Sequence, residues 1–115
     1  MRRGEIRFVD LDPVRGSEAR NNRPVVVVSN DIANATAKRL GRGVVTVVPV
    51  TSNVDRVYPF QVLLPATATG LPRDSKAQAE QVRSVAVERV GKRRGRVPPQ
   101  LLRDLDEALR VHLAL

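Results

Sequence analysis

The fold is decided by the stretch Asn22-Arg23-Pro24-Val25-Val26-Val27-Val28-Ser29-Asn30-Asp31. Its four consecutive valines lie between turn-forming residues, a pattern typical of a strand that is buried on both faces near the centre of a small sheet. Pro24 cannot donate to a strand ladder, so we expect it at the first position of this strand, with Arg23 extended before it. The stretch thereby places one guanidinium at the start of a rigid strand.

The position of Arg23 has two interpretations. Functional groups often lie at a loop edge backed by a rigid scaffold, which favours an anion-binding role. An arginine at a strand start is more often a solvated cation, and the pattern alone favours that role. The preceding loop, residues 12–22, has no apolar anchor except Val14 and Ala19, so we expect it to be exposed.

Outward from this strand, the chain predicts a mainly β domain, of the α+β class, that ends in a helix. Ser29, Asn30 and Asp31 offer caps for a short helix. Residues 76–85 have helical propensity, and we assign them to a strand because their neighbours are strands. The expected strands cover residues 5–11, 25–28, 44–50, 60–64 and 76–85, followed by a strand or hairpin over 89–97, with a helix over 32–38 and turns over 67–75.

The C-terminal helix is predicted to begin within Val97-Pro98-Pro99-Gln100, with proline in or near its first turn. We expect its apolar face to be core or dimer interface, with His112 packed as a structural residue rather than a catalytic one. Asp106 and Arg110 are expected to pair at i,i+4 spacing on the opposite face. The apolar face consists of Leu101, Leu102, Leu105, Ala108, Leu109, His112 and Leu113.

The composition limits the classes of function. A chain of 115 residues predicts one domain, residues 1–115. With no cysteine and one histidine, it offers little to bind a metal, and no cofactor is expected. No apolar run approaches the ~20 residues of a membrane span, so we expect a cytoplasmic protein without a membrane partner.

The charge balance points to a polyanionic partner. Lysine and arginine number 20 against 12 acidic residues, which gives a net charge of +8, and seventeen of the cations are arginine. Guanidinium groups form forked hydrogen bonds with phosphate or carboxylate. Nucleic acid is therefore the leading partner, with affinity that falls as salt rises, and acidic peptides are the alternative.

An arginine and a hydroxyl group remain as a candidate site. Arg23 precedes the second predicted strand and Thr51 follows the third, so both face one groove if these strands share a sheet. Thr51 also has a simpler interpretation, because threonine in a Thr-Ser-Asn run is commonly a turn former.

Six motifs, in order, resemble the MazF/PemK family of toxin endoribonucleases, and especially the actinobacterial MazF toxins. They are Arg3-Gly4-Glu5-Ile6, Gly16-Ser17-Glu18, the stretch from Arg23 to Asp31, Pro49-Val50-Thr51-Ser52-Asn53, Glu80-Gln81-Val82-Arg83-Ser84 and Asp106-Glu107-Ala108-Leu109. The resemblance implies a small PemK/CcdB-type β-barrel with a C-terminal α-helix and a short helix after strand 2. It also implies a homodimeric toxin of a type II toxin-antitoxin system.

The resemblance implies a function as well. Such a toxin cleaves single-stranded RNA at short sequence motifs without a metal, through attack of the 2′-hydroxyl, to leave 2′,3′-cyclic phosphate and 5′-hydroxyl ends. Cleavage inhibits translation and growth. The partners implied are an acidic, MazE-like antitoxin that fills the RNA groove, and operator DNA only as the toxin–antitoxin complex.

Within the family, the equivalents of Arg23 and Thr51 are the central catalytic pair. The general base is less defined, because the PemK branch uses an arginine, an aspartate and a histidine where this chain has Gln78, Glu80 and Ser17. Glu80 or Glu18 is a candidate base, and each is alternatively a surface carboxylate or a partner that orients Arg23.

RNA contacts are expected mainly from two loops, residues 12–22 and 51–59. Tyr58 is the aromatic residue placed to stack on a base, whereas Phe60 is expected in the core. The cationic run from Arg89 to Arg96 is either a solvated face or a second phosphate-tracking surface, without a catalytic role. The RNA-binding candidates are Ser17, Arg20, Asn22, Ser52, Asn53, Arg56, Tyr58, Gln81 and Arg83.

Two other classes of function fit the same architecture. A CcdB-like toxin poisons gyrase without cutting RNA, and a degenerate toxin would act only as a DNA co-repressor together with its antitoxin. The presence of both Arg23 and Thr51 argues against a non-catalytic protein.

Overall fold

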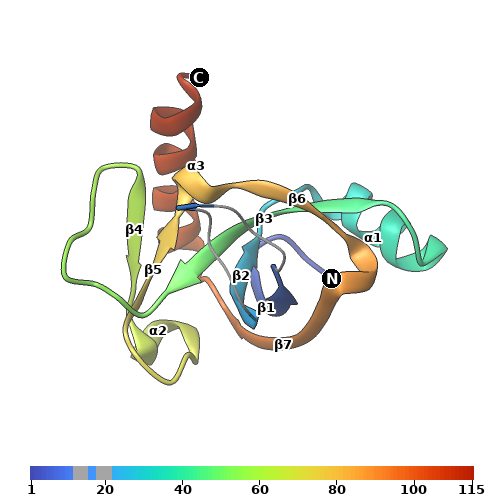
Figure 1. Cartoon of the computed structure of the whole chain (residues 1–115), viewed down its shortest axis with the longest axis horizontal. Coiled ribbons are helices and arrows are strands. Elements are labelled where there is room, and N and C mark those ends of the chain that lie inside the picture. The colour runs from blue at the N-terminus through green and yellow to red at the C-terminus, as the bar shows by residue number, and fades with distance from the viewer. Residues whose placement is uncertain (12–15, 18–21) are drawn as a thin grey trace.

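The structure, a computed structural model, describes residues 1–11, 16–17 and 22–115 (Figure 1). Strands predominate, as the sequence predicts, and short helices follow β2 and β4. The strands are β1 (Glu5–Asp10), β2 (Asn22–Val27), β3 (Val44–Thr51), β4 (Gln61–Leu64), β5 (Ser75–Gln78), β6 (Arg83–Ala86) and β7 (Val90–Arg96). The helices are α1 (Asp31–Leu40), α2 (Ala66–Thr69) and α3 (Pro99–Leu113), with 3₁₀ turns at Ala79–Gln81 and Val87–Arg89.

The strands form one antiparallel sheet in the order β4-β5-β3-β2-β1-β7, with β6 paired to the other end of β3. The two ends of this path, β4 and β7, are not paired to each other in the described part of the chain, so the sheet curves without closing as a complete barrel. This is a small departure from the barrel that the family resemblance implies, and the α+β fold class is confirmed.

Between the two ends of the sheet, α2 packs against β7. A Cβ atom on Gly95 would lie only 2.2 Å from the carbonyl oxygen of Thr69, the last residue of α2. Side chains essentially never approach a carbonyl so closely, which explains why a glycine stands at this position of the strand.

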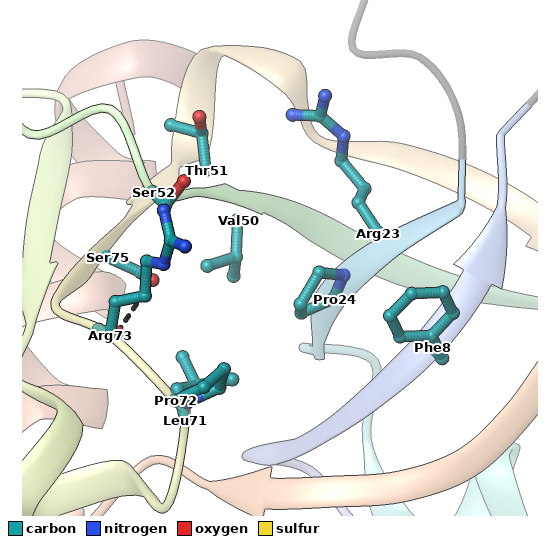
Figure 2. Close-up of a pocket in the computed structure, with 10 residues that line it drawn as sticks. All are labelled: Phe8, Arg23, Pro24, Val50, Thr51, Ser52, Leu71, Pro72, Arg73 and Ser75. Atoms are coloured by element: carbon teal, nitrogen blue, oxygen red, sulfur yellow. Dashed lines mark hydrogen bonds between the residues drawn. The ribbon is translucent and has the colours of Figure 1, made fainter.

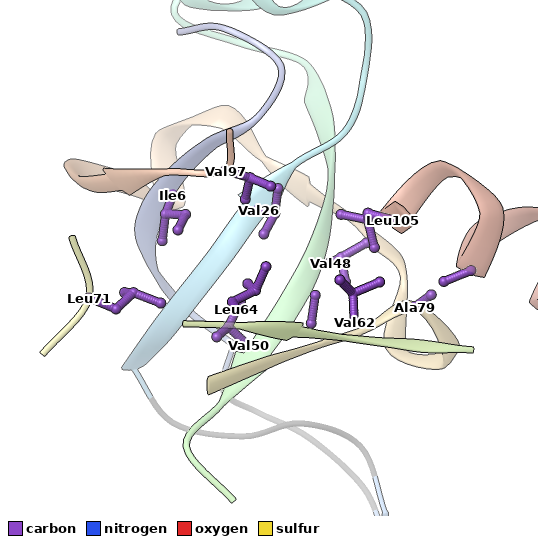
Figure 3. Packing of buried hydrophobic residues seen from close by; sticks show 12 residues of the cluster. Ile6, Val26, Val48, Val50, Val62, Leu64, Leu71, Ala79, Val97 and Leu105 are labelled. Atoms are coloured by element: carbon purple, nitrogen blue, oxygen red, sulfur yellow. The ribbon is translucent and has the colours of Figure 1, made fainter. Parts of the chain in front are cut away.

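The central strands are buried on both faces, as the four valines predict. Val25, Val26 and Val27 are all 0% exposed, and alternate residues of β2 and β3 belong to two different hydrophobic clusters. The larger cluster lies between the sheet and α3, around Ile6, Val26 and Leu105 (Figure 3). The smaller cluster includes Ala37 of α1, so each face of the central sheet is covered by a helix.

Pro24 lies at the third position of β2 rather than the first, because the strand begins at Asn22. Pro24 pairs with Phe8 of β1, whereas the pairing of β2 with β3 begins only at Val25. Pro24 therefore lies beside one neighbouring strand, β1, before the pairing with β3 begins, which fits its lack of a backbone N–H donor.

The helix predicted after β2 is present and capped as expected. The Asn30 side chain accepts a hydrogen bond from the backbone N–H of Ala33 at 2.8 Å, and Gly41 ends the helix in the left-handed region with φ of 64°. An αL residue is a common end for a helix because it satisfies the last carbonyl groups, and glycine adopts it without strain.

Two sequence predictions for the second half of the chain need correction. Residues 76–85 form two strands, β5 and β6, separated by the 3₁₀ turn Ala79–Gln81 rather than one strand. The segment predicted to hold only turns also contains the single helical turn α2. Short elements of this kind are shorter than the sequence window from which periodicity is read.

The predicted face of α3 is only partly buried. Leu105 and Ala108 are in the core, but His112 and Leu113 are exposed in this chain, so His112 is not packed in its core, and the alternative of a dimer interface stays a prediction. The C-terminal end of α3 projects beyond the sheet, which leaves these last positions without a surface to pack on within this chain (Figure 1).

The predicted pair between Asp106 and Arg110 is also wrong. Asp106 instead binds the Arg3 guanidinium at 2.6 Å, and Arg110 pairs with Glu107. Arg3 also donates from Nε to the Val28 carbonyl at 2.7 Å. This arginine therefore connects the N-terminal segment, the end of the valine strand and α3.

Candidate active site

The sheet register brings Arg23 and Thr51 together. β2 and β3 are antiparallel, with Val25 opposite Pro49. Continuing this register by two residues places Arg23 opposite Thr51. Because residues opposite each other project on the same face of an antiparallel sheet, both side chains are directed to one surface.

Both residues line one cavity of about 330 Å³ at the start of β2 and the end of β3 (Figure 2). Arg23 and Thr51 project in the same direction from their two strands, above Val50 and Pro24. The two residues were expected to face one groove if their strands share a sheet, and the register of β2 and β3 meets that condition. The full lining is Phe8, Arg23, Pro24, Val50, Thr51, Ser52, Leu71, Pro72, Arg73 and Ser75.

The Arg23 guanidinium is partly withdrawn from water. Burial lowers the pKa of Arg23 from its ordinary value, because desolvation disfavours the charged form. A guanidinium nevertheless remains protonated in proteins. Its field is therefore less screened than that of a surface arginine, which strengthens attraction for an anion in the cavity.

Thr51 has the turn-forming role that the simpler interpretation predicted. Its Oγ1 accepts a hydrogen bond from the backbone N–H of Asn53 at 3.3 Å, and Asn53 Oδ1 accepts one from the N–H of Asp55 at 3.2 Å. These bonds order the loop after β3. Because Oγ1 only accepts in its bond to Asn53, the hydroxyl hydrogen can still be donated to a ligand, so the two roles of Thr51 are compatible.

Of the other polar residues of the cavity, Ser52 is among the predicted RNA contacts, whereas Arg73 and Ser75 were not predicted from the sequence. Arg73 precedes β5 and lines the cavity across from Arg23, so two guanidinium groups border one space (Figure 2). Ser75 Oγ donates to the Arg73 carbonyl at 3.0 Å. Nothing local to the turn-rich segment distinguishes Arg73, because its place in the cavity depends on how β5 pairs with β3.

The candidate base Glu80 lies elsewhere. It borders a second cavity of about 440 Å³ with Gln81, Val82, Arg83 and Ser84, and none of these lines the Arg23 cavity. One Glu80 oxygen accepts from Gln61 Nε2 at 2.7 Å, and the other is buried without a partner among the described residues. In this chain alone, the structure does not bring Glu80 to Arg23.

The loop after β3 places several RNA-binding candidates together. The rings of Tyr58 and Phe60 stack with centroids 5.4 Å apart, and Lys76 Nζ lies 6.0 Å from the Tyr58 ring centroid. Lys76 also donates to the Arg56 carbonyl at 2.6 Å, which fixes this loop to β5. Tyr58 is exposed, so its outer face is accessible, and Phe60 is half-buried.

The remaining candidates are divided between two regions. Gln81 Nε2 donates to the Ser17 carbonyl at 3.0 Å, which joins the first loop to the cavity of Glu80 and Arg83. Asn22 is the exposed first residue of β2, and Ser52 lines the Arg23 cavity. Glu18 and Arg20 lie outside the described residues.

No three histidine or acidic side chains gather in an arrangement that could hold a metal ion within residues 1–11, 16–17 and 22–115. In the same residues, every helix is too short or too polar to cross a lipid bilayer.

Known proteins resemble this chain along its whole length. Residues 2–113 match the family described as PemK-like, MazF-like toxin of type II toxin-antitoxin system. Endoribonuclease MazF9 of Mycobacterium tuberculosis is 70% identical over 115 residues, which cover 100% of this chain and 98% of that protein.

Solved structures share the fold. A crystal structure of MazF (Form-I) from Deinococcus radiodurans matches with a TM-score of 0.80 at 25% identity, over 100% of this chain and 97% of that one. An endoribonuclease in complex with its cognate antitoxin, from a mycobacterial species, matches with a TM-score of 0.75 at 22% identity, over 100% of this chain and 96% of that one.

Proposed function

This chain belongs to the PemK-like, MazF-like toxins of type II toxin-antitoxin systems, and on that premise we propose that it is a toxin endoribonuclease. It cleaves single-stranded RNA at a short sequence motif and so inhibits translation and growth. The proposal is supported by the 70% identity to an endoribonuclease over the full chain. The single structural observation that carries it is the presence of Arg23 and Thr51 in one cavity.

The chemistry uses the substrate's own nucleophile. The ribose 2′-oxygen attacks the adjacent phosphorus while a base accepts the 2′-hydroxyl proton. The bond from phosphorus to the 5′-oxygen then breaks, and that oxygen takes up a proton. The products carry a 2′,3′-cyclic phosphate and a 5′-hydroxyl group, and the reaction consumes no cofactor.

The protein's main task is to stabilise negative charge on the phosphorane. The Arg23 guanidinium binds the scissile phosphate, and its partial burial makes this interaction stronger than at an open surface. The Thr51 hydroxyl donates to a non-bridging oxygen. Arg73, on the other side of the cavity, binds the same phosphate group or its neighbour.

Proton transfer is the less defined part of the proposal. Glu18 and Glu80 stay the candidates for the base, and Arg23 contributes charge more than it contributes a proton because a guanidinium stays protonated in proteins. Since Glu80 borders another cavity of this chain, its participation requires the Glu80 of a second subunit or a rearrangement.

The toxin assignment implies partners. We propose an acidic antitoxin that competes with RNA for the basic groove, in line with the solved complex of a structural relative with its cognate antitoxin. We also propose a homodimer, a cytoplasmic location and binding of operator DNA only together with the antitoxin. The proposed RNA contacts are Ser17, Arg20, Asn22, Ser52, Asn53, Arg56, Tyr58, Gln81 and Arg83.

The test is cleavage of total RNA by the purified, antitoxin-free protein in excess chelator, followed by sequencing of the released 5′-hydroxyl ends. We expect cuts at one recurrent motif. Arg23→Ala should lower the cleavage rate by about 10³-fold, because it removes the charge that stabilises the transition state. Its melting temperature should stay within a few degrees of the wild type.

Arg39→Ala is the matched control, because Arg39 is exposed in the last turn of α1 and carries the same charge. It should cleave at the wild-type rate. Intact RNA after prolonged incubation with the folded wild type would favour a non-catalytic toxin. Unchanged cleavage by Arg23→Ala would remove Arg23 from the mechanism.

A further inference from the structure

A second cationic cavity lies on the other face of the sheet edge, between β7, the start of β1 and the N-terminal segment. It has a volume of about 230 Å³ and is lined by four arginines and two acids: Arg2, Arg3, Glu5, Asp31, Arg93 and Arg96. None of these residues lines the cavity that holds Arg23. The cavity therefore needs its own explanation.

Both acids of this cavity are engaged by groups other than its free arginines. Glu5 forms an ion pair with Arg7 at 2.7 Å, with each side chain only 14% exposed. Asp31 accepts a hydrogen bond from the backbone N–H of Arg3 at 2.6 Å, and the Arg3 side chain is bound to Asp106 and to the Val28 carbonyl.

Three cations of the cavity are left over. Neither a hydrogen bond nor an ion pair joins the side chain of Arg2, Arg93 or Arg96 to another residue in the described ranges. Glu5 is paired with Arg7, so only the Asp31 carboxylate offsets these three like charges, which repel each other unless a further anion lies between them. The cavity is thus suited to a phosphate or carboxylate, the groups that guanidinium recognises with forked hydrogen bonds.

The cations continue from this cavity around the edge of the sheet toward Arg23. In the register of β7 with β1, Arg93 lies opposite Arg7 and Arg96 lies opposite Glu5. Both arginines therefore lie on the face of the sheet that bears the cavity of Arg2, Arg93 and Arg96. Arg94 lies instead over the Phe8 ring, with its guanidinium carbon 4.9 Å from the ring centroid, and Phe8 lines the Arg23 cavity.

No strand of the described chain covers this edge, because β7 ends the strand order. Lys92, Arg93, Arg94 and Arg96 are all exposed, and β7 contains no acidic residue. A polyanion that leaves the Arg23 cavity past Phe8 and Arg94 can therefore pass around β7 and reach Arg93, Arg96 and Arg2.

We propose that the β7 edge and the cavity of Arg2, Arg93 and Arg96 form a second phosphate-binding site, which holds the backbone of the RNA substrate outside the cleaved motif. This inference rests on the proposed function and adds to it a preference for longer RNA. The site reads no sequence, because contacts to phosphate position a nucleic acid without identifying its bases.

RNA fits this surface better than an acidic peptide does. The cations lie on both faces of one strand edge, so their ligand must carry regularly repeated charge along a path that bends around β7. A phosphodiester backbone has one charge per nucleotide and bends freely when single-stranded. The path also begins at the cavity in which the RNA is cut, which an RNA chain must leave in both directions.

The test compares two unstructured RNAs that contain the same mapped cleavage motif, one of about 7 nucleotides and one of about 30. Binding is measured with a 2′-deoxyribose at the cleavage position, which removes the attacking hydroxyl group. Cleavage is measured with the unmodified RNA. We expect the wild type to bind the longer RNA roughly tenfold more tightly. Arg93→Gln/Arg96→Gln should lose this advantage and keep the wild-type kcat/KM on the short RNA.

The salt dependence gives a second readout. Removing two phosphate contacts should reduce the slope of log affinity against log salt for the longer RNA by about 1.4, since each contact on a single strand contributes about 0.7. Arg93→Lys/Arg96→Lys keeps both charges and should retain most of that slope. Arg39→Gln/Arg42→Gln, at the far end of α1, is the charge-matched control and should keep the length preference.

Each contrary result has a distinct meaning. Unchanged binding of the longer RNA by Arg93→Gln/Arg96→Gln would overturn the second site, as would an equal loss on both RNAs. Weaker binding of the antitoxin with unchanged RNA binding would assign the cavity to a peptide instead. If the wild type releases no 5′-hydroxyl ends from total RNA but binds an unstructured RNA of about 30 nucleotides more tightly than one of about 7 through these arginines, the proposed function fails and the binding site stands.

Discussion

Thr51 combines a structural role in the fold with the chemical role that we propose for it. Its Oγ1 orders the loop after β3 by accepting from the Asn53 N–H, and its hydroxyl hydrogen is available to the cavity that it shares with Arg23. An arginine and a hydroxyl on adjacent strands need no mobile loop to meet. The sheet itself holds them, so little reorganisation is needed when phosphate binds.

Substitutions of Thr51 separate these two roles. Thr51→Val keeps the shape but removes both hydrogen bonds, and we expect it to lower kcat by about 10²-fold, as for loss of one donor to a developing negative charge. Thr51→Ser keeps the hydroxyl and should stay within about tenfold of the wild type. Single-turnover cleavage of the mapped motif measures both, and equal rates for the valine and serine variants would contradict a role for the hydroxyl.

At the scale of elements, β7 combines close packing with a charged edge. Both features are visible in its sequence, Val90-Gly91-Lys92-Arg93-Arg94-Gly95-Arg96. Its glycines allow close packing, at Gly95 against α2 and at Gly91 against Phe8. Its cations keep the exposed edge charged, which also discourages pairing with strands of other molecules. The strand that carries the proposed second RNA site is therefore held in place by close packing at its two glycines.

The packing of β7 against α2 can be tested with two glycines of the same strand. In Gly95→Ala the new Cβ would meet the Thr69 carbonyl oxygen at 2.2 Å, whereas in Gly91→Ala the nearest atom, the Phe8 carbonyl oxygen, is 3.0 Å away. We expect Gly95→Ala to destabilise the fold by about 3 kcal/mol, and Gly91→Ala by about 1 kcal/mol. Thermal unfolding of both variants measures which substitution destabilises the fold more. A smaller effect at Gly95 than at Gly91 would mean that α2 moves away at little cost.

At the scale of the whole molecule, two partly buried ion pairs hold the start of the chain in place, one by reaching α3 and the other within β1. Arg3 joins the N-terminal segment to α3 through Asp106, and Arg7 binds Glu5 beside β7. Burial alone would raise the pKa of the Glu5 carboxyl, but the hydrogen bond and charge of Arg7 outweigh burial and lower this pKa from 4.5. Folding thus favours the ionised form of Glu5.

This shift predicts how stability depends on pH. A carboxyl group whose pKa is lower in the folded state stabilises the fold above its unfolded value of 4.5, and that contribution is lost as the pH falls through the folded value. Glu5→Gln should lower the free energy of unfolding at pH 7 by about 2 kcal/mol, because Arg7 loses a charged partner. The difference in unfolding free energy between Glu5→Gln and the wild type should shrink below pH 4.5. Urea unfolding at pH 7 and below pH 4.5 measures this difference. A difference that stays constant would contradict the role of the Glu5 charge.

Much of the fold is determined locally. The valines of β2 are buried on both faces, Asn30 caps α1, and Pro99 begins α3. These features were predictable because each is indicated by a short stretch of neighbouring residues. The candidate pair Arg23 and Thr51 was also identifiable, since each flanks a strong strand signal and lies in a motif of the family. Their meeting required only that two buried strands share a sheet.

The tertiary structure alone decided the contacts that span the chain. Asp106 pairs with Arg3, 103 positions away, rather than with Arg110, because the closing of α3 on the sheet brings in a partner that helical spacing does not reveal. Arg73 reaches the Arg23 cavity, and Glu80 does not, because of the pairing of β5 and the turn that follows it. Periodicity predicts which residues form an element, whereas the contacts between elements depend on how their surfaces pack, which no single stretch of sequence specifies.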